Sequence, residues 1–196
     1  MNLFKKMAVI IAGGVIMATT MSFLAPSKDG KYSIASGTKL TWSAAKVTAT
    51  HTGTVQVKSG NVSLKGGIVT AGTIVMNMET INCTDMGGEY GKKFEGHLNS
   101  DDFFSVEKFK ESKLVITKYK KVNANTVTLT GNLTIKGVSK PVTFDATVEP
   151  SGKKDVKIKG TMVVDRTLYG ITYKGMADNL IKDNFEIQFD FTASAQ

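Results

Sequence analysis

The chain has 196 residues, a formal net charge of +8, a single cysteine and 8% aromatic residues. One cysteine excludes an internal disulfide, so the stability of the folded chain must come from core packing. The positive charge is scattered as single lysines between apolar residues, which is typical of solvent-facing positions, and attraction to anionic lipid headgroups is its alternative role. No nucleic-acid-binding motif accompanies this charge, so the sequence argues against a nucleic-acid-binding protein.

The N-terminus predicts an export signal. Two lysines precede the apolar run 7–18, which is followed by small and polar residues, and this is the order of a secretory signal peptide. The apolar run is short for a membrane span. We expect residues 1–22 to be a signal peptide cleaved after Ser22, with Ala18 and Ala25 as alternative cleavage sites. An uncleaved N-terminal anchor is the alternative.

The rest of the chain, residues 23–196, is expected to form one domain rich in strands. Apolar and polar side chains alternate along short runs, as in strands with one dry and one wet face. The clearest run is NFEIQFDFTAS, in which every second residue from Phe185 to Phe191 is apolar. In chain order the predicted strands cover residues 31–35, 38–50, 72–79, 113–120, 126–137, 140–149, 155–165 and 184–194.

Glycine and proline positions are expected to mark the turns between these strands. The turn residues predicted in this way are Gly60, Gly66, Gly67 and the segment 150–152. Residues 82–112 interrupt the strand pattern, and Phe94 and Leu98 are spaced to share one face of a helix. This segment therefore predicts one or two short helices that cap the domain or form a lid.

About eight strands in one domain predict an all-β, antiparallel barrel, because closure removes every exposed sheet edge. The interior of an eight-stranded barrel is either filled by side chains or holds one small ligand. Alternation is the same in both cases, so the sequence leaves this choice open. An outer-membrane barrel would also alternate, but a chain with one tryptophan would populate two aromatic girdles poorly. We therefore expect a soluble barrel with an apolar interior.

No catalytic motif is present, whether a nucleophile elbow, a zinc-binding helix motif, a C-x-x-C pair or a phosphate-binding loop. The two histidines, His51 and His97, could bind a metal together with Asp101 or Asp102, but no spacing enforces such a site. We expect neither catalytic residues nor a metal. Arg166 follows the strand 155–165, and two placements are open for it. It either points outward or lies at the barrel mouth, where it would pair with an anionic headgroup or with Asp165.

Four segments together resemble the YceI-like family, in the same order and at similar spacings. They are TATHTGTVQVKSGNV (48–62), FEGHLNSDDFF (94–104), GNLTIKGVSKPVTFDATV (131–148) and DRTLYGI (165–171). The resemblance runs from about Lys31 to Ser194. It implies a lipocalin-like barrel that binds a polyisoprenoid lipid in the bacterial periplasm. The chain departs from the common R-S-D-F-G-I pattern at residues 166–171, where it reads RTLYGI.

The resemblance implies that the barrel interior is a tunnel for a polyprenyl or quinone-type lipid, which the protein stores or transports. No cofactor is expected besides that bound lipid or quinone. The expected tunnel wall comprises Trp42, Met76, Met78, Leu129, Phe144 and Phe189. The expected cap or mouth comprises Phe94, Phe103 and Tyr169, with His51 and Arg166 as polar partners of the ligand.

Two alternative functions remain open on the sequence. One is an enzyme acting on a lipid through its histidines, and the other is a solid barrel that binds another envelope protein, because a filled core needs the same inward residues. The expected partners are an isoprenoid lipid and, transiently, an anionic membrane surface, without nucleic acid. The oligomeric state stays open, with a homodimer as one option.

Overall fold

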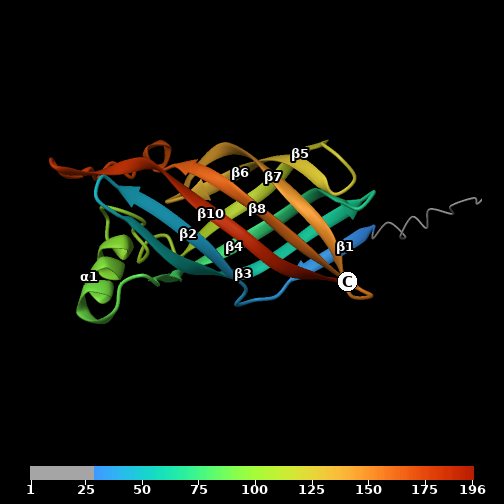
Figure 1. Ribbon diagram of the computed structural model, residues 1–196, viewed down its shortest axis with the longest axis horizontal. Helices are drawn as coiled ribbons and strands as arrows, with labels where there is room; N and C mark the ends of the chain where they lie inside the picture. The colour runs from blue at the N-terminus through green and yellow to red at the C-terminus, as the bar shows by residue number, and fades with distance from the viewer. Residues whose placement is uncertain (1–28) are drawn as a thin grey trace, which may run out of the picture.

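The computed structural model describes residues 29–196, which form a closed antiparallel barrel with one α-helix at one end (Figure 1). The expected signal peptide, residues 1–22, lies outside the described residues. The strands are β1 (Gly30–Ile34), β2 (Lys39–Lys46), β3 (Thr50–Lys65), β4 (Ile68–Cys83), β5 (Glu111–Lys121), β6 (Thr126–Ile135), β7 (Val138–Ser151), β8 (Asp155–Asp165), β9 (Gly175–Met176) and β10 (Asn179–Ala195). The helices are α1 (Gly88–Asn99) and the short 3-10 helix η1 (Arg166–Tyr169).

The barrel wall has eight strand positions. Each strand from β2 to β8 pairs with the next, and β10 closes the circuit by pairing with β8 and with β2. Strand β1 pairs with β3 and β10, the same neighbours that β2 has, so β1 and β2 fill successive stretches of one position. The predicted all-β barrel of about eight strands is confirmed, and closure leaves no free edge in the wall.

The alternating residues point as the sequence predicts, with the apolar face inside. In β10, Ile187 and Phe191 are buried, while Phe185 and Phe189 are half-buried and pack against the same core. The side chains of Val127 and Leu133 of β6 have no exposed surface. Burial of such side chains supplies the stability that a chain without disulfides requires.

One predicted turn is wrong. Gly60 lies inside β3, which continues as a strand from Thr50 to Lys65. A Cβ atom at Gly60 would lie 2.9 Å from Cδ1 of Ile34, so this glycine lets β1 approach β3 closely. The turn at Gly66 and Gly67 is confirmed, with φ angles of 61° and 77°. The turn predicted at 150–152 lies at 152–154 instead, because β7 continues to Ser151.

The predicted interruption at residues 82–112 is confirmed as one helix, α1, followed by a compact turn region. Among residues 29–196, no helix is both long and apolar enough to cross a membrane. Figure 1 shows α1 at the end of the barrel where β2, β4 and β8 end and β10 begins. The turns at Gly66–Gly67 and 152–154 and the C-terminus lie at the opposite end. Helix α1 therefore covers one mouth of the barrel.

Candidate ligand-binding site

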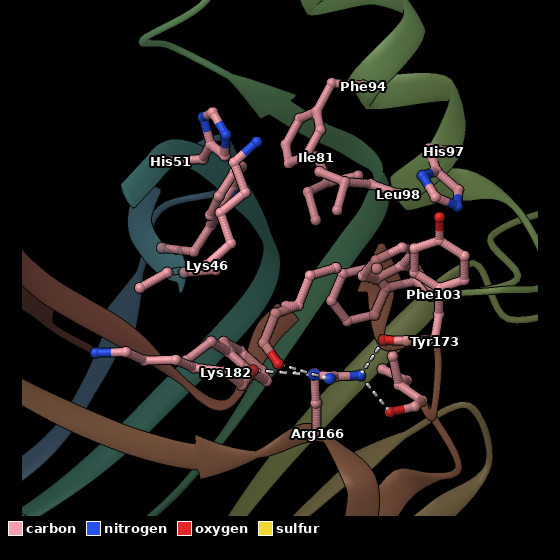
Figure 2. A pocket seen from close by; sticks show the side chains of 18 of the residues that line it. Lys46, His51, Ile81, Phe94, His97, Leu98, Phe103, Arg166, Tyr173 and Lys182 are labelled. Atoms are coloured by element: carbon pink, nitrogen blue, oxygen red, sulfur yellow. Dashed lines mark hydrogen bonds between the residues drawn. The ribbon is translucent and has the colours of Figure 1, made fainter. Parts of the chain in front are cut away.

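A cavity of about 340 Å³ lies inside the covered mouth of the barrel (Figure 2). This volume falls within the range of roughly 300–1,000 Å³ found for small-molecule sites. Most of the lining side chains are apolar, and many of them come from β2, β4, α1, the segment 171–176 and the first half of β10. The cavity is thus a place where water-insoluble groups can be held away from solvent.

Helix α1 supplies the roof of this cavity. Phe94 and Leu98 are four residues apart, and both line the cavity, as their helical spacing predicts. After the helix the chain folds back, with the backbone N–H of Phe104 donating to the carbonyl of Leu98 at 3.0 Å. This turn places Phe103 and Phe104 on the cavity wall beside the helix.

Arg166 holds the mouth of the barrel together. It is only 5% exposed, and its guanidinium donates to four backbone carbonyls and one carboxylate. The acceptors are the carbonyl oxygens of Lys182 (3.0 Å), Ile171 (2.8 Å), Tyr173 (2.8 Å) and Ile181 (3.2 Å) and the Oδ1 atom of Asp183 (3.3 Å). Figure 2 shows Arg166 below the cavity, with dashed lines to backbone carbonyls on both sides of the guanidinium. A guanidinium has five N–H donors, and all five are used.

This arrangement corrects part of the sequence-based expectation for Arg166. The arginine does lie at the mouth and lines the cavity, but it pairs with Asp183 and not with Asp165. Asp165 instead caps η1, accepting from the backbone N–H of Thr167 at 2.9 Å and from its hydroxyl at 2.6 Å. These hydrogen bonds from Thr167 lower the pKa of Asp165. With its donors all occupied, Arg166 positions the chain around the cavity.

Each of the two histidines faces the cavity and contacts a carboxylate. Nδ1 of His51 lies 2.9 Å from Oδ2 of Asp85, and Nε2 of His97 lies 3.1 Å from Oδ2 of Asp102. His51 and Lys46 lie on one side of the cavity and His97 on the other (Figure 2). The His97 ring also packs edge-on against Phe103 and Tyr173, with centroid distances of 4.8 and 4.7 Å.

Asp85, which contacts the cavity residue His51, is a residue that the sequence did not reveal. Its carboxylate accepts from the backbone N–H of Thr52 at 2.8 Å, from His51, and from Sγ of Cys83 at 3.2 Å. It thereby ties the chain leading into α1 to the start of β3. Burial raises the pKa of the Cys83 thiol, and the contact with Asp85 raises it further, so this cysteine is a weak nucleophile.

Asp85 should make the stability of the barrel sensitive to acid. Burial alone would raise its pKa, but hydrogen bonds from Thr52, His51 and Cys83 outweigh burial and lower the pKa from 3.8 to about 2. Its contribution is therefore present above about pH 4 and is lost as the pH falls towards 2. We expect Asp85→Asn to lower the free energy of unfolding at neutral pH by about 1 kcal/mol, allowing for solvent screening.

Urea unfolding across this pH range measures the effect. The difference in unfolding free energy between the wild type and Asp85→Asn should shrink as the pH falls from about 4 to 2. Asp178→Asn, which alters an exposed carboxylate, is the control. A difference between Asp85→Asn and the wild type that stayed constant with pH would contradict this assignment.

The predicted site residues separate into three groups. Those that line the large cavity are Trp42, His51, Met76, Met78, Phe94, Phe103 and Arg166. Those that line a second pocket of about 40 Å³, deeper in the barrel, are Leu129, Phe144 and Phe189, with Met76 shared between the two. Tyr169 lines neither, since it is buried in η1 with a hydroxyl that has no hydrogen-bond partner among the described residues.

Several cavity residues were not expected from the sequence. Tyr173, Met176 and Ile181 come from the segment around β9 and the start of β10, which shows no clear alternation. The pairing of β9 with β10, Asn179 opposite Met176, and the hydrogen bonds from Arg166 bring this segment over the mouth. Within residues 29–196, no group of three or more His, Cys, Asp and Glu side chains is arranged to hold a metal ion.

Trp42 owes its place on the cavity wall to a glycine. Gly53 lies opposite Trp42 in the β2–β3 pair, and a Cβ atom there would overlap the indole ring and the carbonyl oxygen of Asn82. That carbonyl accepts from Nε1 of Trp42 at 3.1 Å. The indole therefore lies across bare backbone, which fixes its position.

We expect Gly53→Ala to displace Trp42 and to lower the free energy of unfolding by about 1–3 kcal/mol, the usual cost of overpacking. The emission of the chain's single tryptophan should shift to longer wavelength, and chemical denaturation gives the stability. Gly96→Ala is the matched control, because a Cβ atom at that position of α1 meets nothing within 4 Å. An unchanged emission spectrum in Gly53→Ala would contradict this account.

The closed barrel and its covered apolar cavity define a protein of the lipocalin-like class. A model of the YceI-like domain matches residues 32–193, and the chain belongs to the YceI-like family. A UPF0312 protein of Pseudomonas putida is 36% identical over 101 residues, which cover 52% of this chain and 50% of the relative. A UPF0312 protein of Pseudomonas fluorescens is 47% identical over 57 residues, covering 29% of this chain and 30% of the relative. The alignments thus span half or less of these curated relatives.

Solved structures show the same fold. BcnA of Burkholderia cenocepacia has a TM-score of 0.67 at 19% identity, covering 80% of this chain and 96% of BcnA. A polyisoprenoid-binding domain of Saccharophagus degradans, implicated in plant cell wall breakdown, has a TM-score of 0.62 at 12% identity. That alignment covers 86% of this chain and 99% of the domain. The expected lipocalin-like barrel is confirmed by these similarities.

Proposed function

We propose that the protein binds the apolar tail of an isoprenoid lipid, of polyprenyl or quinone type, in the cavity beneath α1. It would store or carry this lipid in the periplasm without chemical change. The observation that carries the proposal is the cavity of about 340 Å³, whose wall is mostly apolar and which lies at a barrel mouth. The polyisoprenoid-binding domain of Saccharophagus degradans, which shares the fold, supports this choice of ligand.

The free energy of burying the tail favours exchange between the cavity and a bilayer over permanent capture in the cavity. Each buried methylene contributes about 0.8 kcal/mol, so one five-carbon isoprene unit contributes on the order of 4 kcal/mol on leaving water. The same gain is available in a bilayer, so only the difference between cavity and bilayer decides where the tail resides. A tail would therefore leave water readily for either site and could move between them.

The polar end of the ligand is proposed to lie near Lys46 and His51. Both line the cavity, and both lie at the turn between β2 and β3. Arg166 is not the proposed anchor, because its donors are all occupied by the protein. An ammonium and an imidazole N–H at this position could donate hydrogen bonds to a phosphate oxygen or a quinone oxygen.

The single tryptophan provides a direct test, because Trp42 lines the cavity. Adding a ubiquinone or a polyprenol to the purified protein should quench or shift its emission in a saturable manner. Mass spectrometry of an organic extract, from protein isolated from its own host without detergent, should detect a stoichiometric isoprenoid. A folded protein that gives a clean extract and shows no emission change would contradict the proposal and favour a solid barrel.

A second candidate function is an enzyme that acts on the same class of lipid. The His51–Asp85 and His97–Asp102 pairs, which both reach the cavity, could act as general acids or bases. Incubating the extracted lipid with the protein would reveal turnover by mass spectrometry. Turnover that disappears in His51→Ala/His97→Ala would establish the enzyme, whereas an unchanged lipid favours the carrier.

A further inference from the structure

Exposed apolar side chains gather around the covered mouth of the barrel. Val47, Tyr90 and Met176 are 69%, 81% and 69% exposed, and Tyr173 and Leu180 are exposed as well. They belong to the β2–β3 turn, to α1 and to the β9–β10 segment, which lie at the same end of the barrel (Figure 1). We call these five residues the apolar rim. Exposed apolar patches of this kind mark surfaces that meet another apolar phase or a partner.

Hydrogen bonds connect the chain segments that carry the rim residues. The backbone N–H of Val47 donates to the carbonyl of Leu180 at 3.0 Å, and the hydroxyl of Thr48 donates to Oδ1 of Asn179 at 2.8 Å. These bonds join the β2–β3 turn to the start of β10. Strand β9 in turn pairs with the start of β10. The backbone thus holds Val47, Met176 and Leu180 in one connected structure.

The rim is also continuous with the cavity. Tyr90, Tyr173 and Met176 are exposed to solvent and line the cavity at the same time. A tail that enters or leaves at this end therefore passes between apolar side chains on both sides of the opening. If the opening faced water, the tail would cross an aqueous layer at a cost of about 0.8 kcal/mol per methylene.

Charge does not explain this surface. The segments 46–51, 85–97 and 173–183, which surround the mouth, contain five lysines and five carboxylates. These are Lys46, Lys92, Lys93, Lys174 and Lys182, and Asp85, Glu89, Glu95, Asp178 and Asp183. The formal charge of these three segments therefore cancels, although the whole chain carries +8. Adhesion at this end must depend on apolar contact more than on attraction to anionic headgroups.

We infer that the apolar rim docks on the surface of a lipid bilayer, so that a lipid tail passes between bilayer and cavity without crossing water. This inference rests on the proposed lipid binding. A bilayer fits better than a protein partner, because the rim surrounds the very opening through which a water-insoluble tail has to move. A surface of exposed valine, methionine, leucine and tyrosine side chains can insert shallowly at the level of the headgroups.

Flotation of the purified protein with phosphatidylcholine vesicles tests the inference. The wild type should bind, and Val47→Asp and Met176→Asp should each weaken binding by about tenfold or more, because a charge replaces a side chain buried in the bilayer. Val122→Asp is the matched control. Val122 is also an exposed valine in a hairpin turn, at 56% exposure, but it lies at the opposite end of the barrel.

Three results would overturn the inference. They are a wild type that does not float with vesicles, an equal loss in Val47→Asp and Val122→Asp, and binding that requires phosphatidylglycerol and disappears with added salt. The emission of Trp42 on adding ubiquinone to the wild type and to Val47→Asp, without vesicles, separates this inference from the proposed function. Val47→Asp should bind ubiquinone as the wild type does, because Val47 does not line the cavity. A wild type that binds ubiquinone but not vesicles would leave the carrier intact and remove the docking surface. A wild type that binds vesicles but not ubiquinone would remove the carrier and leave the docking surface.

Discussion

Replacing Met76 with alanine should change which isoprenoid tails the protein retains. Met76 and Ile187 are the two residues that line both the large cavity and the deeper pocket. They come from β4 and β10, which lie three positions apart around the barrel wall through β2 and β3. Both side chains therefore lie at the boundary between the two spaces, on the floor of the large cavity.

Removing the Met76 side chain should join the two spaces. The deeper pocket is lined entirely by apolar side chains, among them Leu129, Phe144 and Phe189, so it can accept more of a hydrocarbon tail. We expect the affinity for a tail one isoprene unit longer to rise roughly ten- to a hundredfold relative to the shorter tail. The same change should lower the free energy of unfolding by about 2–5 kcal/mol, because Met76 is buried.

Met78→Ala is the matched control for this experiment. Met78 is a methionine of the same strand, equally buried, but it lines the large cavity alone. Quenching of Trp42 by ubiquinones of increasing tail length gives the preferred length for each variant. If Met76→Ala and Met78→Ala preferred the same tail as the wild type, Met76 would not be the floor of the cavity.

Arg166→Ala should be among the most destabilising single substitutions in this chain. It would leave the carbonyls of Ile171, Tyr173, Ile181 and Lys182 without their guanidinium donor. Buried polar groups that lose their partners cost about 1–3 kcal/mol each, and part of this cost is relieved by water. We therefore expect the free energy of unfolding to fall by about 3–5 kcal/mol.

Arg166→Lys should not rescue this loss. A lysine ammonium offers three donors from one nitrogen, and it cannot reproduce the planar fork that reaches five acceptors. Amide hydrogen exchange should speed up in residues 171–183 of both variants, because this segment is held to η1 through the guanidinium. Lys182→Ala removes an exposed neighbouring cation and serves as the control. A loss below about 1 kcal/mol in Arg166→Ala, the range of an ordinary surface substitution, would contradict this role.

Much of the barrel wall was predictable, because the alternation of apolar and polar residues within one strand identifies the side chains that point inward. Alternation in the segment 184–194 correctly placed Ile187 and Phe191 inside the barrel. The loss of alternation after residue 82 correctly predicted a helix in the region of α1. The spacing of Phe94 and Leu98 predicted that they share one face of a helix, and both line the cavity. The turn predicted at Gly60 was wrong, because the sequence does not distinguish a glycine that permits close packing of β1 on β3 from a glycine that forms a turn.

The cavity itself was not predictable from the residues. Alternation predicts that Met76, Leu129 and Phe144 point inward, but it does not predict which residues lie across the barrel from each of them. Whether an inward side chain meets a partner or empty space depends on strands that are distant in sequence. Leu129 and Phe144 border the small pocket, whereas Met78 borders the large one, although all three are inward apolar residues.

The amino-acid sequence by itself determined the class of fold, the position of the helical interruption and the family resemblance, since these depend on local pattern and on short motifs. Only the tertiary structure decided how the polar groups at the mouth are paired. It brought Asp85 to His51 across 34 residues of chain, and it turned Arg166 towards four backbone carbonyls and away from Asp165. The reason is physical, because hydrogen-bond partners and empty volume are set by distances between segments that only folding brings together.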